Sequence, residues 1–98
     1  MSEGVYAAAT RLELNERGIP FEAERRYPVM YRGRLLCHQR LDLFVDRRLV
    51  LEIKSVERLH PVHVAQVVSY LRLSGARVGL LVNFNVPISK QGIRRIVL

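Results

Sequence analysis

The chain has 98 residues, of which 49% are hydrophobic, so it can build one small core and is too apolar for a disordered protein. Sixteen Lys and Arg against nine Asp and Glu give a formal net charge of +7, which permits a polyanionic partner. Cys37 is the one cysteine, which excludes an internal disulfide, and no apolar run approaches the roughly 18 residues of a membrane span. We therefore expect one cytoplasmic domain over residues 1–98, with no membrane partner.

Helical spacing of apolar residues predicts a first helix over residues 2–17, which stops at Gly18 with Pro20 just beyond it. An extended segment follows over residues 21–31. Pro28 lies inside it, and because proline lacks a backbone N–H it marks an edge strand or a bulge.

A turn at residues 32–34 then leads into two predicted strands, over residues 35–45 and 49–56. The short segment 46–48 joins them. Two adjacent strands with so short a connection predict an antiparallel hairpin.

Pro61 suits the start of a second helix over residues 62–74, which ends at Gly75. The nearly all-apolar segment 78–83 is typical of a central strand covered on both faces, and residues 93–98 form a last strand. A strand, a helix and a strand in succession make the two strands parallel. The chain order therefore predicts an α/β fold with a mixed central sheet flanked by helices.

A three-residue loop at 46–48 sets the register of the hairpin and decides which residues share a face. The apolar face pairs Val45 with Leu49, Leu43 with Leu51 and Leu41 with Ile53, and the other face pairs Phe44 with Val50, Asp42 with Glu52 and Arg40 with Lys54. Two carboxylates thus lie opposite each other, which destabilises a sheet unless something neutralises them. A divalent cation is one answer, and a solvent-exposed face balanced by Arg40 and Lys54 is the other.

The spacing itself is informative, because Asp42 is followed ten residues later by Glu52-Ile53-Lys54. This pattern resembles the PD-(D/E)xK nuclease signature. The chemistry explains the residue types: the two carboxylates and the Ile53 carbonyl are suitable metal ligands, and a metal acidifies water and stabilises charge on a phosphate. Lys54 is placed to orient that water or to offset developing charge.

Further segments along nearly the whole chain resemble the GxxExxY family of this superfamily. They are Glu3-Gly4-Val5-Tyr6, residues 18–21, residues 51–59, residues 64–66, Tyr70-Leu71, residues 79–84 and residues 93–98. The resemblance implies a restriction-endonuclease-like core and a nuclease that uses Mg²⁺ or Mn²⁺. It also implies that Asp42 and Glu52 are metal ligands and that Lys54 is the catalytic lysine.

The same resemblance assigns three more residues. Glu3 would be the first-helix acid that contacts the metal directly or through water. Gln66 and Tyr70 match the Gln-x-x-x-Tyr motif of RecB-type relatives and share a helix face. Gln66 would orient Lys54 or a water, and Tyr70 would contact nucleic acid, although a partly buried core tyrosine fits the same spacing.

One feature departs from the family pattern. The family glycine would fall three residues before Glu3, ahead of Met1. We therefore expect a first helix that is short at its amino end, and Glu3 close to a fraying terminus.

Other chemistries find less support. Cys37 and His38 are neighbours on a strand, and His60 and His63 straddle a helix start, so their spacing does not match a structural zinc site. The sequence leaves three functions open. They are a metal-dependent nuclease acting on DNA rather than RNA, an inactive nucleic-acid-binding module, and a protein-interaction or assembly domain. A homodimer or a partner protein would complete so small a chain.

Overall fold

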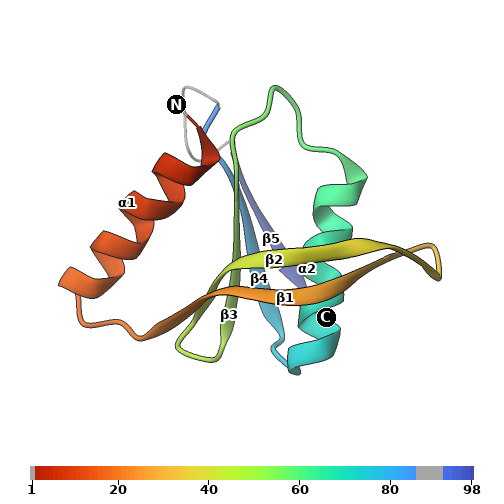
Figure 1. Ribbon diagram of the computed structural model, residues 1–98, viewed down its shortest axis with the longest axis horizontal. Coiled ribbons are helices and arrows are strands. Elements are labelled where there is room, and N and C mark those ends of the chain that lie inside the picture. Colours follow the sequence, from red (N-terminus) through yellow and green to blue (C-terminus); the bar gives the residue numbers. More distant parts are fainter. Residues whose placement is uncertain (1, 86–91) are drawn as a thin grey trace.

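The computed structural model describes residues 2–85 and 92–98. One five-stranded sheet has the order β1-β2-β3-β4-β5, and two helices flank its central strands (Figure 1). The elements are α1 (Glu3–Glu16), β1 (Phe21–Tyr31), β2 (Arg34–Val45), β3 (Leu49–Lys54), α2 (Pro61–Ser74), β4 (Val78–Asn83) and β5 (Ile93–Val97).

The strand directions confirm the predicted fold class. The pairs β1–β2, β2–β3 and β4–β5 are antiparallel, and β3 and β4, which are joined through α2, are parallel. This mixed α/β architecture with two helices is consistent with a restriction-endonuclease-like fold. β1 is an edge strand with a register shift between Val29 and Met30, next to Pro28, as its proline predicts.

The largest difference in boundaries is at the end of β3, which stops at Lys54, whereas the sequence pattern continues to residue 56. The next two backbone N–H groups bond to side chains from elsewhere in the chain. The Ser55 N–H donates to Glu3 Oε2 at 3.1 Å, and the Val56 N–H donates to Asn83 Oδ1 at 3.0 Å. Because these donors are satisfied by α1 and β4, the ladder ends where the first helix reaches the sheet.

The boundaries of α2 follow from local chemistry. The His60 side chain accepts a hydrogen bond from the Val62 N–H at 3.3 Å, and Pro61 occupies the first turn, where a missing N–H costs nothing. Gly75 ends the helix with a φ of 77°, a left-handed conformation that glycine adopts without steric cost.

Two apolar clusters lie on the two helix sides of the sheet. The cluster beneath α1 contains Ala7, Leu43, Val45 and Ile53, with Phe21 and Leu51 among the partly buried residues packed against it. The cluster beneath α2 contains Tyr27, Val29, Leu41, Phe44, Val50, Val67, Tyr70, Leu71, Leu81 and Ile96. β3 therefore has both faces covered.

The predicted hairpin register is confirmed near the turn and wrong beyond it. Val45–Leu49, Phe44–Val50 and Leu43–Leu51 are paired, but among the described residues the ladder between β2 and β3 goes no further. Leu41 packs beneath α2, whereas its expected face partner Leu43 packs beneath α1. The break falls at Asp42, where carboxylates take over the hydrogen bonds of the ladder.

The same break interrupts the pairing of β2 with β1. Ala23 pairs with Leu43 and Arg25 with Leu41, but the intervening Glu24 is unpaired and has a φ of 61°. A positive φ is uncommon for a residue with a Cβ, and here it lets the ribbon change the face that it buries.

Beyond this point the outer part of the β1–β2 ribbon, residues 25–41, lies across α2; we call it the arm. Ser69 of α2 fixes the arm from below, because its hydroxyl accepts a hydrogen bond from the Met30 N–H at 3.0 Å and donates one to the Met30 carbonyl at 3.3 Å. Figure 1 shows the arm crossing in front of α2, with its tip projecting past the helix.

Among the described residues, no helix is both long enough and apolar enough to cross a membrane.

Gly79 of β4 provides a test of the packing between the sheet and α2. A Cβ at this position would overlap Val67 Cγ1, and Val67 is fully buried with one stiff β-branched rotamer. We expect Gly79→Ala to lower the free energy of unfolding by about 1–3 kcal/mol, the usual cost of overpacking. Urea unfolding of Gly79→Ala, Val67→Ala and the double variant should show that Val67→Ala removes most of this cost; additive losses would contradict the contact.

Candidate active site

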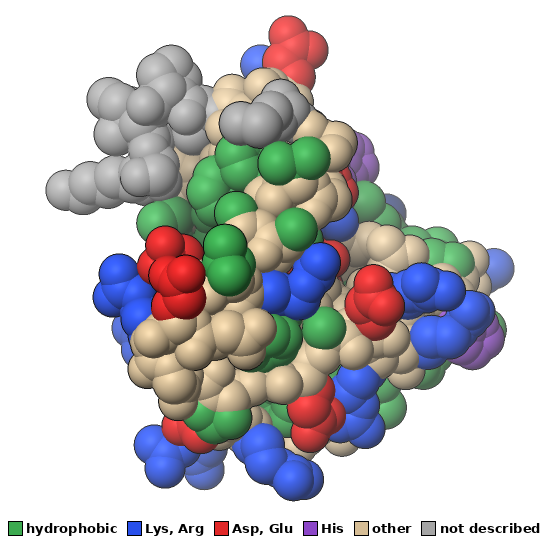
Figure 2. All heavy atoms as spheres, turned by 60° about the vertical axis from the view of Figure 1, so that its left-hand side comes forward, with side chains coloured by type: hydrophobic (Ala, Val, Ile, Leu, Met, Phe, Trp, Pro, Cys, Tyr) green, Lys and Arg blue, Asp and Glu red, His purple; other side chains and the backbone are tan. Residues whose placement is uncertain are grey.

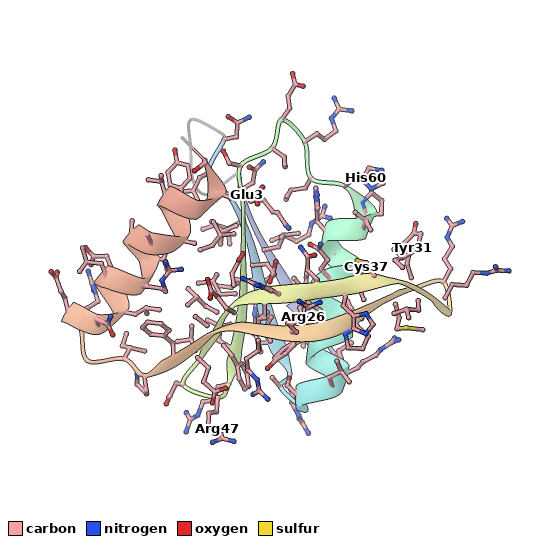
Figure 3. The ribbon with its side chains drawn as sticks, viewed as in Figure 1. Glu3, Arg26, Tyr31, Cys37, Arg47 and His60 are labelled. Carbon is pink, nitrogen blue, oxygen red and sulfur yellow. The ribbon has the colours of Figure 1, made fainter. Side chains whose placement is uncertain are left out.

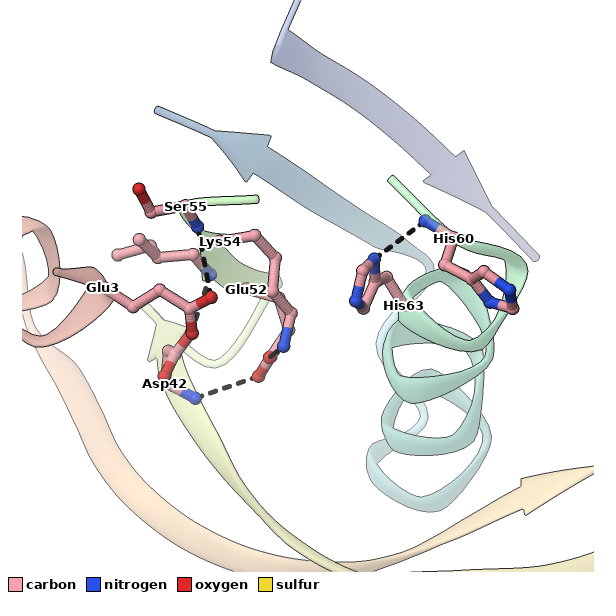
Figure 4. A network of polar contacts seen from close by, with 8 residues as sticks. Glu3, Asp42, Glu52, Lys54, Ser55, His60 and His63 are labelled. Atoms are coloured by element: carbon pink, nitrogen blue, oxygen red, sulfur yellow. Dashed lines mark hydrogen bonds and ion pairs between the residues drawn. The ribbon is translucent and has the colours of Figure 1, made fainter. Parts of the chain in front are cut away.

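The predicted acidic residues meet at the carboxyl end of β3. Asp42 comes from β2, Glu52 and Lys54 from β3, and Glu3 from the first turn of α1 (Figure 4). The first turn of α2, with His63, lies on the other side of Lys54 in the same view. Figure 3 shows Glu3 near the upper end of β3 and Arg47 at the opposite end, on the β2–β3 turn.

Asp42 and Glu52 hold each other in place through backbone hydrogen bonds. The Asp42 N–H donates to Glu52 Oε1 at 3.0 Å, and the Ile53 N–H donates to Asp42 Oδ2 at 2.7 Å. In a regular antiparallel ladder, backbone carbonyls accept from such N–H groups. The carboxylates therefore act as strand-pairing groups, and the two acids lie side by side as their spacing predicts.

Lys54 is the counter-ion of this pair. Its Nζ lies 3.7 Å from Glu52 Oε2, and only 9% of the Lys54 side chain and 1% of the Glu52 side chain are exposed. A buried ion pair has less screening by water than a surface pair. Lys54 is thus held within reach of the carboxylates.

Glu3 connects α1 to this end of the sheet. Its Oε2 accepts the Ser55 N–H at 3.1 Å, one residue after Lys54. The negative charge of Glu3 raises the pKa of both Asp42 and Glu52, which shows that the three carboxylates share one electrostatic environment.

Burial is the main cause of the perturbed acidity. It raises the pKa of Glu52 from 4.5 to about 7, and repulsion by Asp42 adds to the shift, while the Asp42 N–H and Lys54 oppose it. Burial also raises the pKa of Asp42, against the Ile53 hydrogen bond and the charges of Lys54 and Arg11. Perturbed pairs of this kind are concentrated at functional sites.

The donor chemistry fits a hard divalent cation. One oxygen of each carboxylate accepts a backbone N–H, which leaves Asp42 Oδ1 and the Lys54-paired Glu52 Oε2. Magnesium is commonly bound by one or two carboxylates plus waters and substrate phosphates. Within residues 2–85 and 92–98, however, no three His, Cys, Asp or Glu side chains are grouped closely enough to hold an ion. Glu3 therefore lies outside the Asp42–Glu52 pair. The contact that the structure shows for Ile53 is its backbone N–H, which donates to Asp42 Oδ2.

The two predicted α2 residues occupy different environments. Gln66 Oε1 is buried and has no hydrogen-bond partner within the described part of the chain. Tyr70 is 4% exposed, and its ring packs edge-on against Tyr27 at 5.2 Å and Phe44 at 5.5 Å. Tyr70 is thus a core aromatic whose ring packs on Tyr27 and Phe44.

Two contributors were missed by sequence reasoning. Arg11 lowers the pKa of Asp42, and it stands eight residues after Glu3, so the helical period places both on one face of α1. The Tyr27 hydroxyl is buried without a partner among the described residues, and its pKa is raised by burial and by the charges of Glu52 and Asp42. The spacing on α1 could have identified Arg11, whereas no local pattern identifies Tyr27.

His60 and His63 have a structural role at the start of α2. His63 Nδ1 accepts the His60 N–H at 2.9 Å and so completes the cap of α2. Burial, and next the charge of Lys54, lower the pKa of His63, so it borders the site from the helix side. Cys37 is exposed on the arm.

Comparison with known families agrees with this geometry. A family model described as "PD-(D/E)XK nuclease superfamily" matches residues 1–96. The chain therefore belongs to the PD-(D/E)XK nuclease superfamily, whose members generally use divalent metals. No match was found among curated proteins or solved structures.

The raised pKa of Glu52 predicts how stability depends on pH in metal-free protein. Between pH 4.5 and about 7 the folded protein keeps a proton that the unfolded chain has released, so the free energy of unfolding falls as the pH rises. Glu52→Gln removes this titration. We expect urea unfolding in EDTA to show a shallower fall from pH 5 to pH 8 for Glu52→Gln than for wild type. Glu57→Gln, at an exposed position, should keep the wild-type slope, and equal slopes in all three proteins would contradict the burial effect.

Proposed function

We propose that this chain is a metal-dependent nuclease that hydrolyses phosphodiester bonds in DNA. The main support is the pair of half-buried Asp42 and buried Glu52, with Lys54 Nζ 3.7 Å from Glu52, in a member of a nuclease superfamily. The net charge of +7 suits a polyanionic substrate.

Asp42 and Glu52 are the proposed ligands of Mg²⁺ or Mn²⁺, with the Ile53 carbonyl beside them and Glu3 acting through water. Such a cation supplies a water of lowered pKa and stabilises charge on the phosphate. The chain itself supplies the rest. Lys54 orients the attacking water or offsets charge on the phosphate, and its near-complete burial strengthens either interaction.

Gln66 and Tyr70 are proposed to support this arrangement from α2. The unpartnered Gln66 Oε1 supports a role in orienting Lys54 or a water, because a buried acceptor without a partner costs about 1–3 kcal/mol. Tyr70 is proposed to support the site by packing in the core beneath α2. Its ring lies against Tyr27 and is not available to stack on a base.

The proposals on subfamily, domain extent, cellular location and partner rest on the sequence. We propose that the chain belongs to the GxxExxY branch, which Glu3 and Tyr6 support, and we infer that residues 1–98 form one nuclease-like domain acting in the cytoplasm. Because a chain of this size holds little beyond the carboxylates and their scaffold, we propose that a second copy or a partner protein contributes to target choice.

A second candidate is an inactive nucleic-acid-binding module with the same fold. It is favoured by one observation: within the described ranges Glu3 does not join Asp42 and Glu52 in a three-carboxylate cluster. RNA in place of DNA is the alternative substrate.

Cleavage assays separate these candidates. With Mg²⁺ or Mn²⁺ we expect wild-type protein to cleave DNA, and Asp42→Asn and Lys54→Ala each to lower the rate at least about 100-fold, because each removes a group that acts on the transition state. The matched controls are Asp46→Asn and Arg48→Ala, which make the same charge changes at exposed positions of the β2–β3 turn. Metal-dependent cleavage that survives in Asp42→Asn or Lys54→Ala would contradict the catalytic roles of these residues. DNA binding without metal-dependent cleavage by wild type would contradict the nuclease and favour the binding module.

Metal binding has a readout that does not need activity. Mg²⁺ at ten times its dissociation constant should stabilise the folded protein by about 1.4 kcal/mol, and so raise the Tm of wild type. Asp42→Asn should abolish this shift, whereas Asp46→Asn should retain it. A shift of equal size in all three proteins would show that the cation binds elsewhere.

A further inference from the structure

The positive charge of the chain is densest in the arm. Residues 25–41 contain five arginines, namely Arg25, Arg26, Arg32, Arg34 and Arg40, and no aspartate or glutamate. The rest of the chain has 11 basic and nine acidic residues, so it is close to neutral. On the face drawn in Figure 2, Lys and Arg side chains lie both at the edges and near the middle, with Asp and Glu between them. Residues 58–98 also lack aspartate and glutamate, but they carry only six basic residues over 41 positions. The arm is therefore the segment in which charge of a single sign is densest.

Two of these arginines oppose each other across the strands. Arg26 and Arg40 are Cα partners in the β1–β2 ladder, which places their side chains on one face with Cβ atoms about 5 Å apart. Both are exposed, and neither forms an ion pair with a described residue. Like charges directly opposite each other destabilise a sheet. An anion between two guanidinium groups removes this repulsion, and phosphate oxygens match their fork geometry.

The surface beside this pair continues the same chemistry. Arg25, Arg26 and Arg47 line a hollow of about 490 Å³ between the arm and α2, with Tyr70, Leu73 and Ser74 on its helix side. Arg25 forms an ion pair with Glu22 at 2.9 Å, so, among the described residues, the unpaired charge at this hollow comes from Arg26 and Arg47. Arg47 belongs to the β2–β3 turn, so the basic surface runs from the arm to the end of β3 opposite Glu3 (Figure 3). Along β2 in the other direction, Asp42 follows Arg40 by two residues, about 7 Å of strand. An anion chain held by the arm would therefore pass close to the carboxylates.

The aromatic side chains indicate which form of nucleic acid fits. Proteins that hold single strands generally stack bases on exposed aromatic rings. None of the seven aromatic residues, all within the described ranges, is exposed: Tyr27, Phe44 and Tyr70 are buried, and Tyr6, Phe21, Tyr31 and Phe84 are half-buried. The outer face near Arg26 and Arg40 has no exposed Phe or Tyr ring, although the smaller imidazole of His38 is exposed on it. A face dominated by charge suits the backbone of a duplex, where the bases are already stacked.

We propose that the outer face of the arm, centred on the opposed Arg26–Arg40 pair, binds the sugar-phosphate backbone of a nucleic acid duplex and aligns it beside Asp42. Whether the bound strand is then cleaved rests on the proposed nuclease function.

Binding is measured without metal, so that cleavage plays no part. In EDTA, fluorescence anisotropy with a labelled 24-base-pair DNA duplex and with one of its strands alone should show tighter binding to the duplex. Arg26→Ala/Arg40→Ala should weaken duplex binding roughly tenfold at low salt and reduce the slope of log K against log salt by about 2, since each phosphate contact contributes about 0.9. The control Arg94→Ala/Arg95→Ala removes the same charge from exposed positions of β5 and should change the affinity less than about twofold.

A charge reversal distinguishes lost binding from lost folding. Arg26→Glu places a carboxylate opposite Arg40 and so replaces repulsion with attraction. The Tm should therefore rise by about 2–5 °C while duplex binding falls. A variant that is more stable yet binds less tightly cannot owe its loss to unfolding.

The outcomes separate this inference from the proposed function. Duplex cleavage with unchanged affinity in the arm variants would overturn the role of the arm and leave the nuclease intact. Arm-dependent duplex binding without cleavage would support the arm and contradict the nuclease. Equal weakening by the arm and β5 variants, or tighter binding to the single strand, would also overturn the proposal.

Discussion

The structure depends on a replacement of backbone hydrogen bonds between β2 and β3 by bonds from backbone N–H groups to carboxylates. Asp42 and Glu52 each accept an N–H from the opposite strand, so side chains replace backbone carbonyls at this point of the ladder. The replacement holds a buried and a half-buried carboxylate side by side, an arrangement that raises the pKa of each one. Lys54 and the end of α1 can reach the pair because the ladder opens here.

The same opening lets β1 and β2 serve both sides of the sheet. Before the break Leu43 packs beneath α1, and beyond it Leu41 packs beneath α2. Glu24, left unpaired at a positive φ, shows that β1 turns at the same place. Two ordinary twisted strands could not change faces so abruptly while keeping every ladder bond. The acid pair and the arm are thus two results of one interruption in β2.

Sequence reasoning succeeded where the signal is local. Apolar alternation next to a short turn located Val45–Leu49 and Leu43–Leu51, and it brought Asp42 to Glu52. It failed at Leu41 because a period of two assumes that backbone groups keep pairing, and nothing in the pattern shows a carboxylate accepting an N–H. Tyr70 was predicted from a motif to contact nucleic acid, but its burial depends on Tyr27 and Phe44, which are distant in sequence.

Two electrostatic conflicts of opposite sign remain close together on β2. Asp42 faces a second buried carboxylate, and Arg40, two residues earlier, faces a second guanidinium in Arg26. Each conflict lowers the stability of the chain on its own, and each is relieved by the opposite charge. A divalent cation relieves only the first and an isolated anion only the second. A phosphodiester backbone with a bound cation would relieve both at once, and this shared relief is the physical reason to propose the acid pair and the arm as parts of one binding surface.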